Sequence, residues 1–163
     1  MADLQLLDDA LLDDLIARAR RSPRRRLNHN FHRGPDDNPH RFLNALVRGT
    51  YVRPHRHVTP PKDESFLVLR GRVGVVVFDD EGRLAGHHAL GGPGEPLGLD
   101  LRAGAWHALV ALTEAAVIYE VKPGPWDPAT DKDFADWAPP EGTPEAEAFL
   151  ARLLKPFGGT AGC

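Results

Sequence analysis

The stretch from residue 41 to residue 122 places the strongest constraint on the fold. Short apolar segments rich in β-branched and aromatic residues recur there, separated by turn residues. Residues 66–69 and 73–78 are predicted to be adjoining strands, with a hairpin turn after them at residues 79–82. Residues 107–112 and 115–121 are predicted to pair as another hairpin. No alternation of strands with helices, the pattern of a parallel sheet, occurs here, so the sequence predicts an antiparallel β-barrel or jelly roll.

A helix is predicted on each side of this stretch. Apolar residues at spacings of three and four predict an N-terminal helix from about Leu4 to Ala19. Near the other end, Thr143 can cap a helix that begins at Pro144. The apolar stripe of this second helix is Ala146, Phe149, Leu150, Leu153 and Leu154.

The 163 residues are interpreted as one domain, because a chain of this length can bury a single sizeable core. Residues 1–40 form an N-terminal helix and an arginine-rich segment in this interpretation. Residues 41–122 form the barrel, and residues 123–163 form a C-terminal wrap and helix.

Composition narrows the classes of partner. The formal net charge is −3, which argues against attraction of the whole molecule to nucleic acid. The only cysteine is Cys163, so no disulfide can form within the chain. The sequence shows neither the basic-then-apolar order of a signal peptide nor an apolar run of membrane-spanning length. We therefore expect a cytoplasmic protein with no nucleic-acid or membrane partner.

Three histidines and a carboxylate suggest a metal site. His55 and His57 are one residue apart, so on a strand both side chains point to the same face. Glu64 follows, and His107 stands far downstream in the segment Gly-Ala-Trp-His. A lone pair of histidines at this spacing is more often a surface or packing feature. Together with the glutamate and the third histidine, it favours a site for one divalent transition metal, with Fe, Mn, Ni or Zn as candidates.

The spacing of these residues resembles the cupin superfamily. Gly49-x5-His55-x-His57 followed by Glu64-x6-Gly71 is similar to the first cupin signature, and Gly104-x2-His107 is similar to the second. The resemblance implies a double-stranded β-helix, also called a jelly roll, with these four side chains as metal ligands. Barrels of this class commonly pair through an exposed sheet edge, which makes a homodimer the expected assembly.

The sequence departs from the common cupin signatures at defined places. Six residues separate His57 from Glu64, where three or four are usual, and residues 59–62 form a plausible turn insertion. Arg102 and Ala111 replace the usual proline and asparagine of the second signature. Asp63 is an alternative carboxylate ligand, but Glu64 keeps the six-residue spacing to Gly71 and is favoured.

A wider set of motifs resembles the WbuC family of cupin-fold metalloproteins. That family is associated with bacterial surface-polysaccharide (O-antigen, lipopolysaccharide) gene clusters, and the resemblance covers nearly the whole chain from about residue 24. The segments that carry it are residues 25–32, 41–46, 53–57, 69–72, 78–82, 120–125, 131–135 and 137–142.

Other residues are candidates for catalysis or substrate binding. If the parity of His55 extends backwards, Tyr51 and Arg53 also point inwards, as a proton donor and an anion clamp. Their alternatives are a barrel-mouth aromatic and a salt bridge. Glu120 and Lys122 share one strand face, and an outward ion pair is the favoured interpretation. If that face points inwards instead, Glu120 is a candidate base.

The segment before the barrel offers further candidates. Asn28, His29 and His32 can hydrogen-bond a sugar, and the two histidines can instead add metal ligands at the barrel mouth, although such residues more often hold a loop in place. Arg26 belongs to an arginine run that can bind a phosphorylated or nucleotide-activated sugar. The favoured alternative is that this run pairs with the aspartates of the first helix.

Three functions follow from this set of residues. The preferred hypothesis is a metal-dependent, isomerase- or epimerase-like enzyme that acts on a sugar derivative, such as a sugar phosphate or nucleotide-sugar. The second is an Fe(II)-dependent dioxygenase. The third is a non-catalytic, metal-dependent domain that binds or senses a small molecule or sugar, because a fold alone does not establish catalysis.

Overall fold

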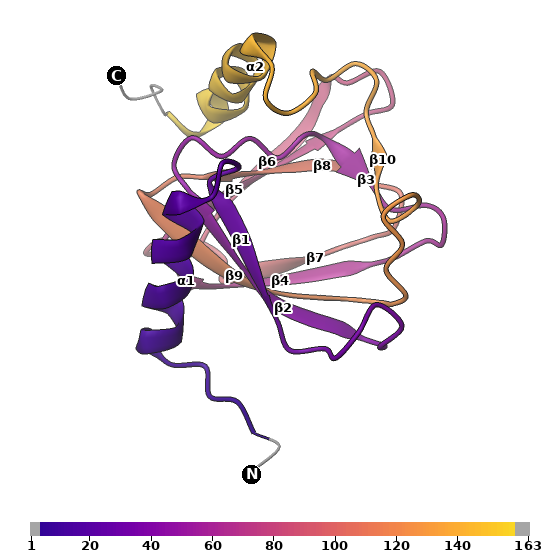
Figure 1. Cartoon of the computed structure of the whole chain (residues 1–163). Helices are drawn as coiled ribbons and strands as arrows, with labels where there is room; N and C mark the ends of the chain where they lie inside the picture. Colours follow the sequence, from indigo (N-terminus) through magenta and orange to yellow (C-terminus); the bar gives the residue numbers. More distant parts are fainter. Residues whose placement is uncertain (1–3, 159–163) are drawn as a thin grey trace.

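The computed structural model of the chain describes residues 4–158, so Cys163 lies outside the described part. Two five-stranded antiparallel sheets face each other (Figure 1). The first sheet has the order β1 (Arg26–Asn30), β2 (His40–Val47), β9 (Ala115–Lys122), β4 (Glu64–Arg70) and β7 (Gly98–Leu101). The second has the order β10 (Asp133–Phe134), β3 (His55–Arg56), β8 (Trp106–Ala111), β5 (Val73–Phe78) and β6 (Leu84–Leu90). The predicted mainly β, antiparallel fold is confirmed.

A buried apolar cluster fills one end of the space between the sheets. It includes Phe66 and Ile118 from the first sheet, and Val75 and Leu109 from the second. Because side chains alternate along a strand, the other face of each sheet points outwards and needs its own cover. A helix supplies that cover on each side.

Helix α1 (Asp9–Arg21) covers the first sheet (Figure 1). Its Leu12, Leu15, Ile16 and Ala19 pack against outward side chains of β2 and β9 in a second buried cluster. The helix begins five residues later than the apolar spacing predicts. The reason is its cap, since the Asp8 side chain accepts a hydrogen bond from the Leu11 amide at 2.9 Å.

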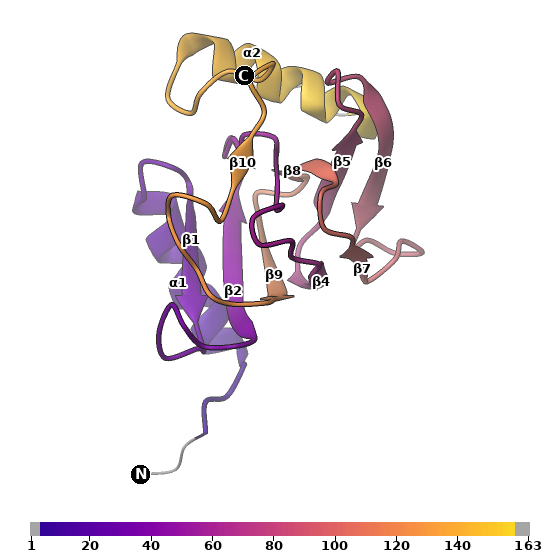
Figure 2. The same ribbon diagram turned by 90° about the vertical axis from the view of Figure 1, so that its right-hand side faces the viewer.

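Helix α2 (Pro144–Leu154), followed by the short 3₁₀ turn η1 (Lys155–Phe157), covers the second sheet (Figure 2). Ala146, Phe149 and Leu153 pack against outward residues of β5 and β8. Trp106 lies in this cluster and faces away from the barrel interior. The position of Thr143 at the helix start is also confirmed, although its side chain forms no capping hydrogen bond.

Two predicted strand pairings are wrong. Residues 107–112 and 115–121 do not form a hairpin, because β8 pairs with β3 and β5 in the second sheet while β9 pairs with β2 and β4 in the first. Likewise β4 and β5 belong to opposite sheets. Both edges of β8 and of β9 are taken by strands distant in sequence, so each short connection carries the chain from one sheet to the other. The hairpin turn at residues 79–82 is confirmed between β5 and β6.

Two glycines of the sequence signatures occupy backbone conformations that other residues rarely adopt. Gly71 has φ +71° at the crossing from β4 to β5, and a Cβ there would lie 2.3 Å from the Ala115 carbonyl oxygen. Gly104 has φ +81° in the turn before β8. The turn at Gly104 therefore places His107 near the start of β8.

The chain after β9 runs along one open side of the barrel, through β10, to α2 (Figure 2). This connecting segment, residues 123–143, brings Asp131 and Lys132 to the space between the sheets. Among residues 4–158, no helix is both long and apolar enough to cross a membrane.

Candidate metal centre and its cavity

Four side chains converge between the two sheets. Ligand atoms of His55, His57, Glu64 and His107 all lie within 4.8 Å of one another. His55 and His107 are direct partners across β3 and β8, His57 follows β3, and Glu64 begins β4 in the opposite sheet. All four side chains are only 2–3% exposed. The sequence prediction brought together the same four residues.

Each imidazole is held by a backbone carbonyl. Nδ1 of His55 donates to the Arg53 oxygen at 2.9 Å, and Nδ1 of His107 donates to the Ala105 oxygen at 3.0 Å. Nδ1 of His57 donates to the Asp131 oxygen. A carbonyl only accepts, so Nδ1 carries the proton in all three rings. In a neutral ring with the proton on Nδ1, Nε2 is a bare acceptor, the arrangement that orients histidine ligands in metal sites.

The Nε2 atoms face a carboxylate that cannot satisfy them. His57 Nε2 lies 3.1 Å from Glu64 Oε1, and His107 Nε2 lies 3.1 Å from Glu64 Oε2. Among the residues that the structure describes, neither His57 Nε2 nor Glu64 Oε2 has a hydrogen-bond partner. Burial, together with the charge of Lys132, lowers the pKa of His55 well below its usual value, which keeps that ring neutral.

A divalent cation fits this donor set. Imidazole Nε2 atoms and carboxylate oxygens converge in this buried site without enough donors among them, and a metal ion would satisfy all of them. The residues that could hold it are His55, His57, Glu64 and His107. Asp63 is not among them, since its carboxylate accepts hydrogen bonds from Arg102 and from the Ala103 amide.

A cavity of about 740 Å³ opens from this centre. His55, Glu64 and His107 lie in its wall, and Phe42, Phe66 and Leu109 form apolar parts of it. Polar and charged groups line the remainder: Arg24, Arg26, Asn28, Asn30, His32, Arg33, His40, Asn44, Glu120, Lys122, Asp131 and Lys132. This volume lies within the range of small-molecule sites.

Glu120 and Lys122 face into this cavity. The favoured outward orientation is wrong, because both residues are 6% exposed and line the cavity wall on β9. They share the inward face of β9 with Ile118, and the alternate residues of that strand face α1. Burial, together with the charge of neighbouring Glu64, raises the pKa of Glu120 to about 8. A second carboxyl group thus lies beside the candidate metal ligands.

Sequence reasoning missed a buried charge network beside the centre. The Asp131 carboxylate lies 2.6 Å from Lys62 Nζ and 3.1 Å from Lys122 Nζ. Lys122 Nζ is also 3.6 Å from Glu64 Oε1. Since the Asp131 carbonyl accepts from His57, this network fixes a candidate ligand to the segment after β9. The only sequence signals were the lysine of the 59–62 insertion and the 131–135 motif.

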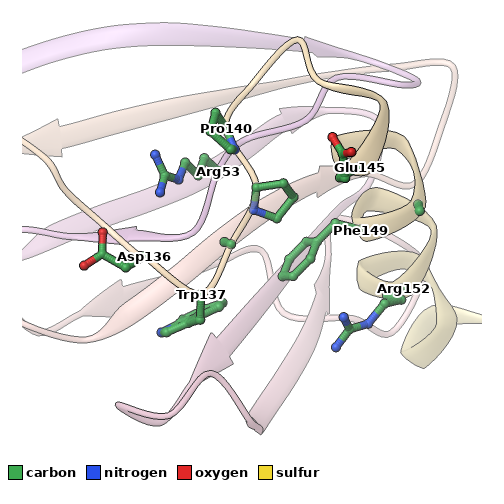
Figure 3. Close-up of a pocket in the computed structure, with 10 residues that line it drawn as sticks. Arg53, Asp136, Trp137, Pro140, Glu145, Phe149 and Arg152 are labelled. Carbon is green, nitrogen blue, oxygen red and sulfur yellow. The ribbon is translucent and has the colours of Figure 1, made fainter.

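Tyr51 and Arg53 do not face the metal centre. Residues 51–54 are not part of a strand, so the parity of His55 does not extend to them. Tyr51 packs against Phe149 of α2 and donates a hydrogen bond to the Pro139 carbonyl at 3.0 Å. Arg53 donates to the Ala135 carbonyl at 2.6 Å and lines a separate groove beside Trp137 and Phe149 (Figure 3). Both therefore support the C-terminal segment from outside the barrel.

Arg26, Asn28 and His32 line the cavity, on and just after β1. The favoured interpretation of the N-terminal arginine run, in which it pairs with the aspartates of the first helix, is wrong for most of its arginines. Arg24 and Arg26 pair with Glu141 instead, while Arg18 makes an ion pair with Asp14. His29 lies on the other face of β1, near Gln5.

Solved structures with the same fold include sugar-related proteins. An L-ribose isomerase of Cellulomonas parahominis, solved with L-psicose, is 16% identical, with a TM-score of 0.56 over 69% of this chain and 70% of that one. The capsular polysaccharide assembling protein CapF of Staphylococcus aureus is 22% identical, with a TM-score of 0.55 over 66% of this chain. The matched region is 28% of CapF. Protein SO0799 of Shewanella oneidensis is 13% identical, with a TM-score of 0.52 over 66% of this chain and 72% of that one. At these identities the likeness shows the fold, which is cupin-like.

No curated protein sequence matches this chain. One family model does match, over residues 7–90, which is just over half of the 163 residues. The matched region runs from the N-terminal helix to the end of β6 and contains three of the four candidate ligands. The chain belongs to the family described as "Domain of unknown function (DUF6016)".

Proposed function

We propose that this protein is a metal-dependent enzyme that acts on a sugar or nucleotide-sugar by isomerase- or epimerase-like proton transfer. The observation that carries the proposal is the convergence of three Nε2 acceptors and the Glu64 carboxylate at the wall of a cavity that also contains Glu120. A bound divalent metal would supply Lewis-acid polarisation of a carbonyl or hydroxyl oxygen.

The residues of the chain supply the remaining functions. Glu120 is placed to take a proton from a carbon beside the polarised oxygen and to return it to the same or a neighbouring carbon. Phe42 and Phe66 limit water around this carboxyl group, being its neighbours across the first sheet. Asn28 and His32 at the cavity wall can hydrogen-bond sugar hydroxyls.

Two further observations support a sugar substrate and a role in bacterial surface-polysaccharide assembly, such as that of O-antigen. The sequence motifs resemble the WbuC family, and we propose that the protein is a cupin of that type. In addition, the proteins of similar fold include one named for capsular polysaccharide assembly and one sugar isomerase.

Metal analysis of the native protein tests the first part of the proposal. We expect one divalent transition metal per chain, and we expect His57→Ala to lose it because one of its four ligands is gone. His88→Ala, at an exposed position on β6, is the matched control and should retain the metal. Native protein without metal, or undiminished metal in His57→Ala, would contradict the proposal.

Solvent exchange tests the chemistry. The metal-loaded protein is incubated in D₂O with a panel of aldoses, ketoses and nucleotide-sugars, and deuterium at carbon is followed by NMR. We expect exchange with a member of the panel, and its loss in Glu120→Gln at unchanged metal content. Exchange at the wild-type rate in Glu120→Gln would remove this residue from the mechanism.

A further inference from the structure

Lys132 is a cation in the cavity without a fixed counter-ion. Its side chain lines the same cavity as His55, Glu64 and Glu120, and the residue is partly buried. Within residues 4–158 its ammonium group makes no hydrogen bond and no ion pair within 4.0 Å. Burial, with the charge of Lys122, lowers the pKa of Lys132 from its usual value. Burying a charged group is costly unless a group of opposite charge compensates it.

The acidic residues nearest to Lys132 in sequence form ion pairs with other residues. Asp131 binds Lys62 and Lys122 through its two carboxylate oxygens. Asp133 accepts a hydrogen bond from Arg56 Nε at 2.7 Å. Neither aspartate that flanks Lys132 along the chain is therefore free to neutralise it.

None of the other carboxylates of this region forms an ion pair with Lys132 within 4.0 Å in the described residues. Glu141 holds Arg24 and Arg26, which line the outer part of the cavity. Glu64 belongs to the candidate metal centre and has Lys122 at 3.6 Å. Glu120 makes no ion pair with Lys132 within 4.0 Å in the described residues, and the charges of Glu64 and Glu120 act on Lys132 only from a greater distance. The ammonium group of Lys132 is therefore available to a ligand in the cavity.

We propose that this cavity contains an anion subsite, and that the substrate carries a carboxylate or phosphate group bound by Lys132. The inference rests on the proposed function, since it concerns the same cavity. Arg26 adds to the positive potential there, because it shares the single carboxylate of Glu141 with Arg24. Its side chain is 10% exposed and donates a hydrogen bond to the Tyr51 carbonyl at 2.9 Å. A cavity of about 740 Å³ has room for a monosaccharide that bears such a group.

Calorimetric titration of the metal-loaded protein tests the subsite. The probes are inorganic phosphate for the phosphate class, glucuronate for the carboxylate class, and glucose as the uncharged reference. We expect at least one anion to bind at least tenfold more tightly than glucose. Lys132→Gln should weaken that binding about tenfold or more, as expected for loss of a hydrogen bond to a charged group. The matched control, Lys155→Gln, removes the same charge from the exposed turn after α2 and should bind as the wild type does.

The same titrations identify the results that would overturn the subsite. Equal affinity in Lys132→Gln and wild type would overturn it, as would failure of both anions to bind the wild type. Anion binding that survives in Lys132→Gln but disappears on chelation would show the anion on the metal and would also overturn it. Metal content, measured separately, tests the proposed function: metal-free native protein with Lys132-dependent anion binding would refute the enzyme proposal and leave the subsite standing.

Discussion

At the scale of single residues, the candidate centre is prepared by hydrogen bonds to backbone carbonyls. In His55 and His107, Nδ1 donates to the carbonyl of the residue two positions earlier. This local contact fixes both the proton position and the ring orientation. The Nε2 atoms are therefore directed to one point before any cation arrives, which lowers the cost of ordering the ligands on binding.

The adjacent acids Asp63 and Glu64 provide a paired test of ligand identity. Glu64→Gln replaces a buried, charged acceptor, so we expect divalent-metal affinity to fall at least tenfold. Asp63→Asn changes a carboxylate that accepts from Arg102 and the Ala103 amide, and should leave the affinity within twofold. Titration against a competing chelator measures both. A larger loss in Asp63→Asn than in Glu64→Gln would reverse the assignment.

The Asp131 network predicts a large effect on stability. Asp131→Asn leaves Lys62 buried without its anion and Lys122 with only Glu64 at 3.6 Å, and breaking a buried pair in this way costs about 3–5 kcal/mol. Urea unfolding measures the change in the free energy of unfolding. The control is Asp133→Asn, where the ion pair with Arg56 has a carboxylate 40% exposed and the cost should be about 0–1 kcal/mol. Equal losses in the two variants would count against the network.

The residues differ in how far the sequence predicts them. The four candidate ligands follow from the His-x-His pair and the spacing of the two signatures, which are local features of the sequence. Tyr51 and Arg53 were misplaced since parity holds only within a continuous strand, and β3 is two residues long. Lys62 and Asp131 were missed because their contact joins a turn to an irregular segment 69 residues away, which no periodicity records.

At the scale of secondary structure, capping decides where α1 begins. Apolar spacing alone extends the helix back to Leu4, yet Leu4, Leu6 and Leu7 are exposed and lie before it. The Asp8 carboxylate accepts a hydrogen bond from the Leu11 amide, and its negative charge interacts favourably with the positive end of the helix dipole. A capping side chain therefore outweighs a continuing apolar pattern that has nothing to pack against.

The two helix starts give a matched prediction. Asp8→Ala removes a capping hydrogen bond and should lower the free energy of unfolding by about 1 kcal/mol. Thr143→Ala occurs at the start of α2, where the side chain makes no capping bond and instead donates to the Pro140 carbonyl. That change should stay within about 0.5 kcal/mol. Urea unfolding of both variants checks the order, and a costlier Thr143→Ala would contradict it.

Strand pairing shows the limit of local prediction at this scale. The segments that became β4, β5, β8 and β9 were recognisable as strands from composition. Their partners were not, because short connections such as residues 112–114 fit either a hairpin or a crossing between sheets. Each of β8 and β9 lies between two strands that are distant in sequence, so its partners are known only once the whole sheet is assembled.

At the scale of the whole molecule, the candidate centre joins the two sheets. His55, His57 and His107 come from the second sheet or its immediate continuation, while Glu64 comes from the first. The cavity lies between the sheets beside this centre, and much of its wall is polar or charged. A cation bound by residues of both sheets would therefore link the two sheets at this place.

Metal removal should therefore destabilise the fold. Free metal at 100 times its dissociation constant stabilises the native state by about 2.7 kcal/mol, provided that the unfolded chain does not bind it. For a protein of this size, that corresponds to a rise in Tm of roughly 5–10 °C. Scanning calorimetry of metal-loaded and chelated protein measures this difference, and Glu64→Gln should show little of it. The same Tm with and without metal would mean that no cation links the sheets.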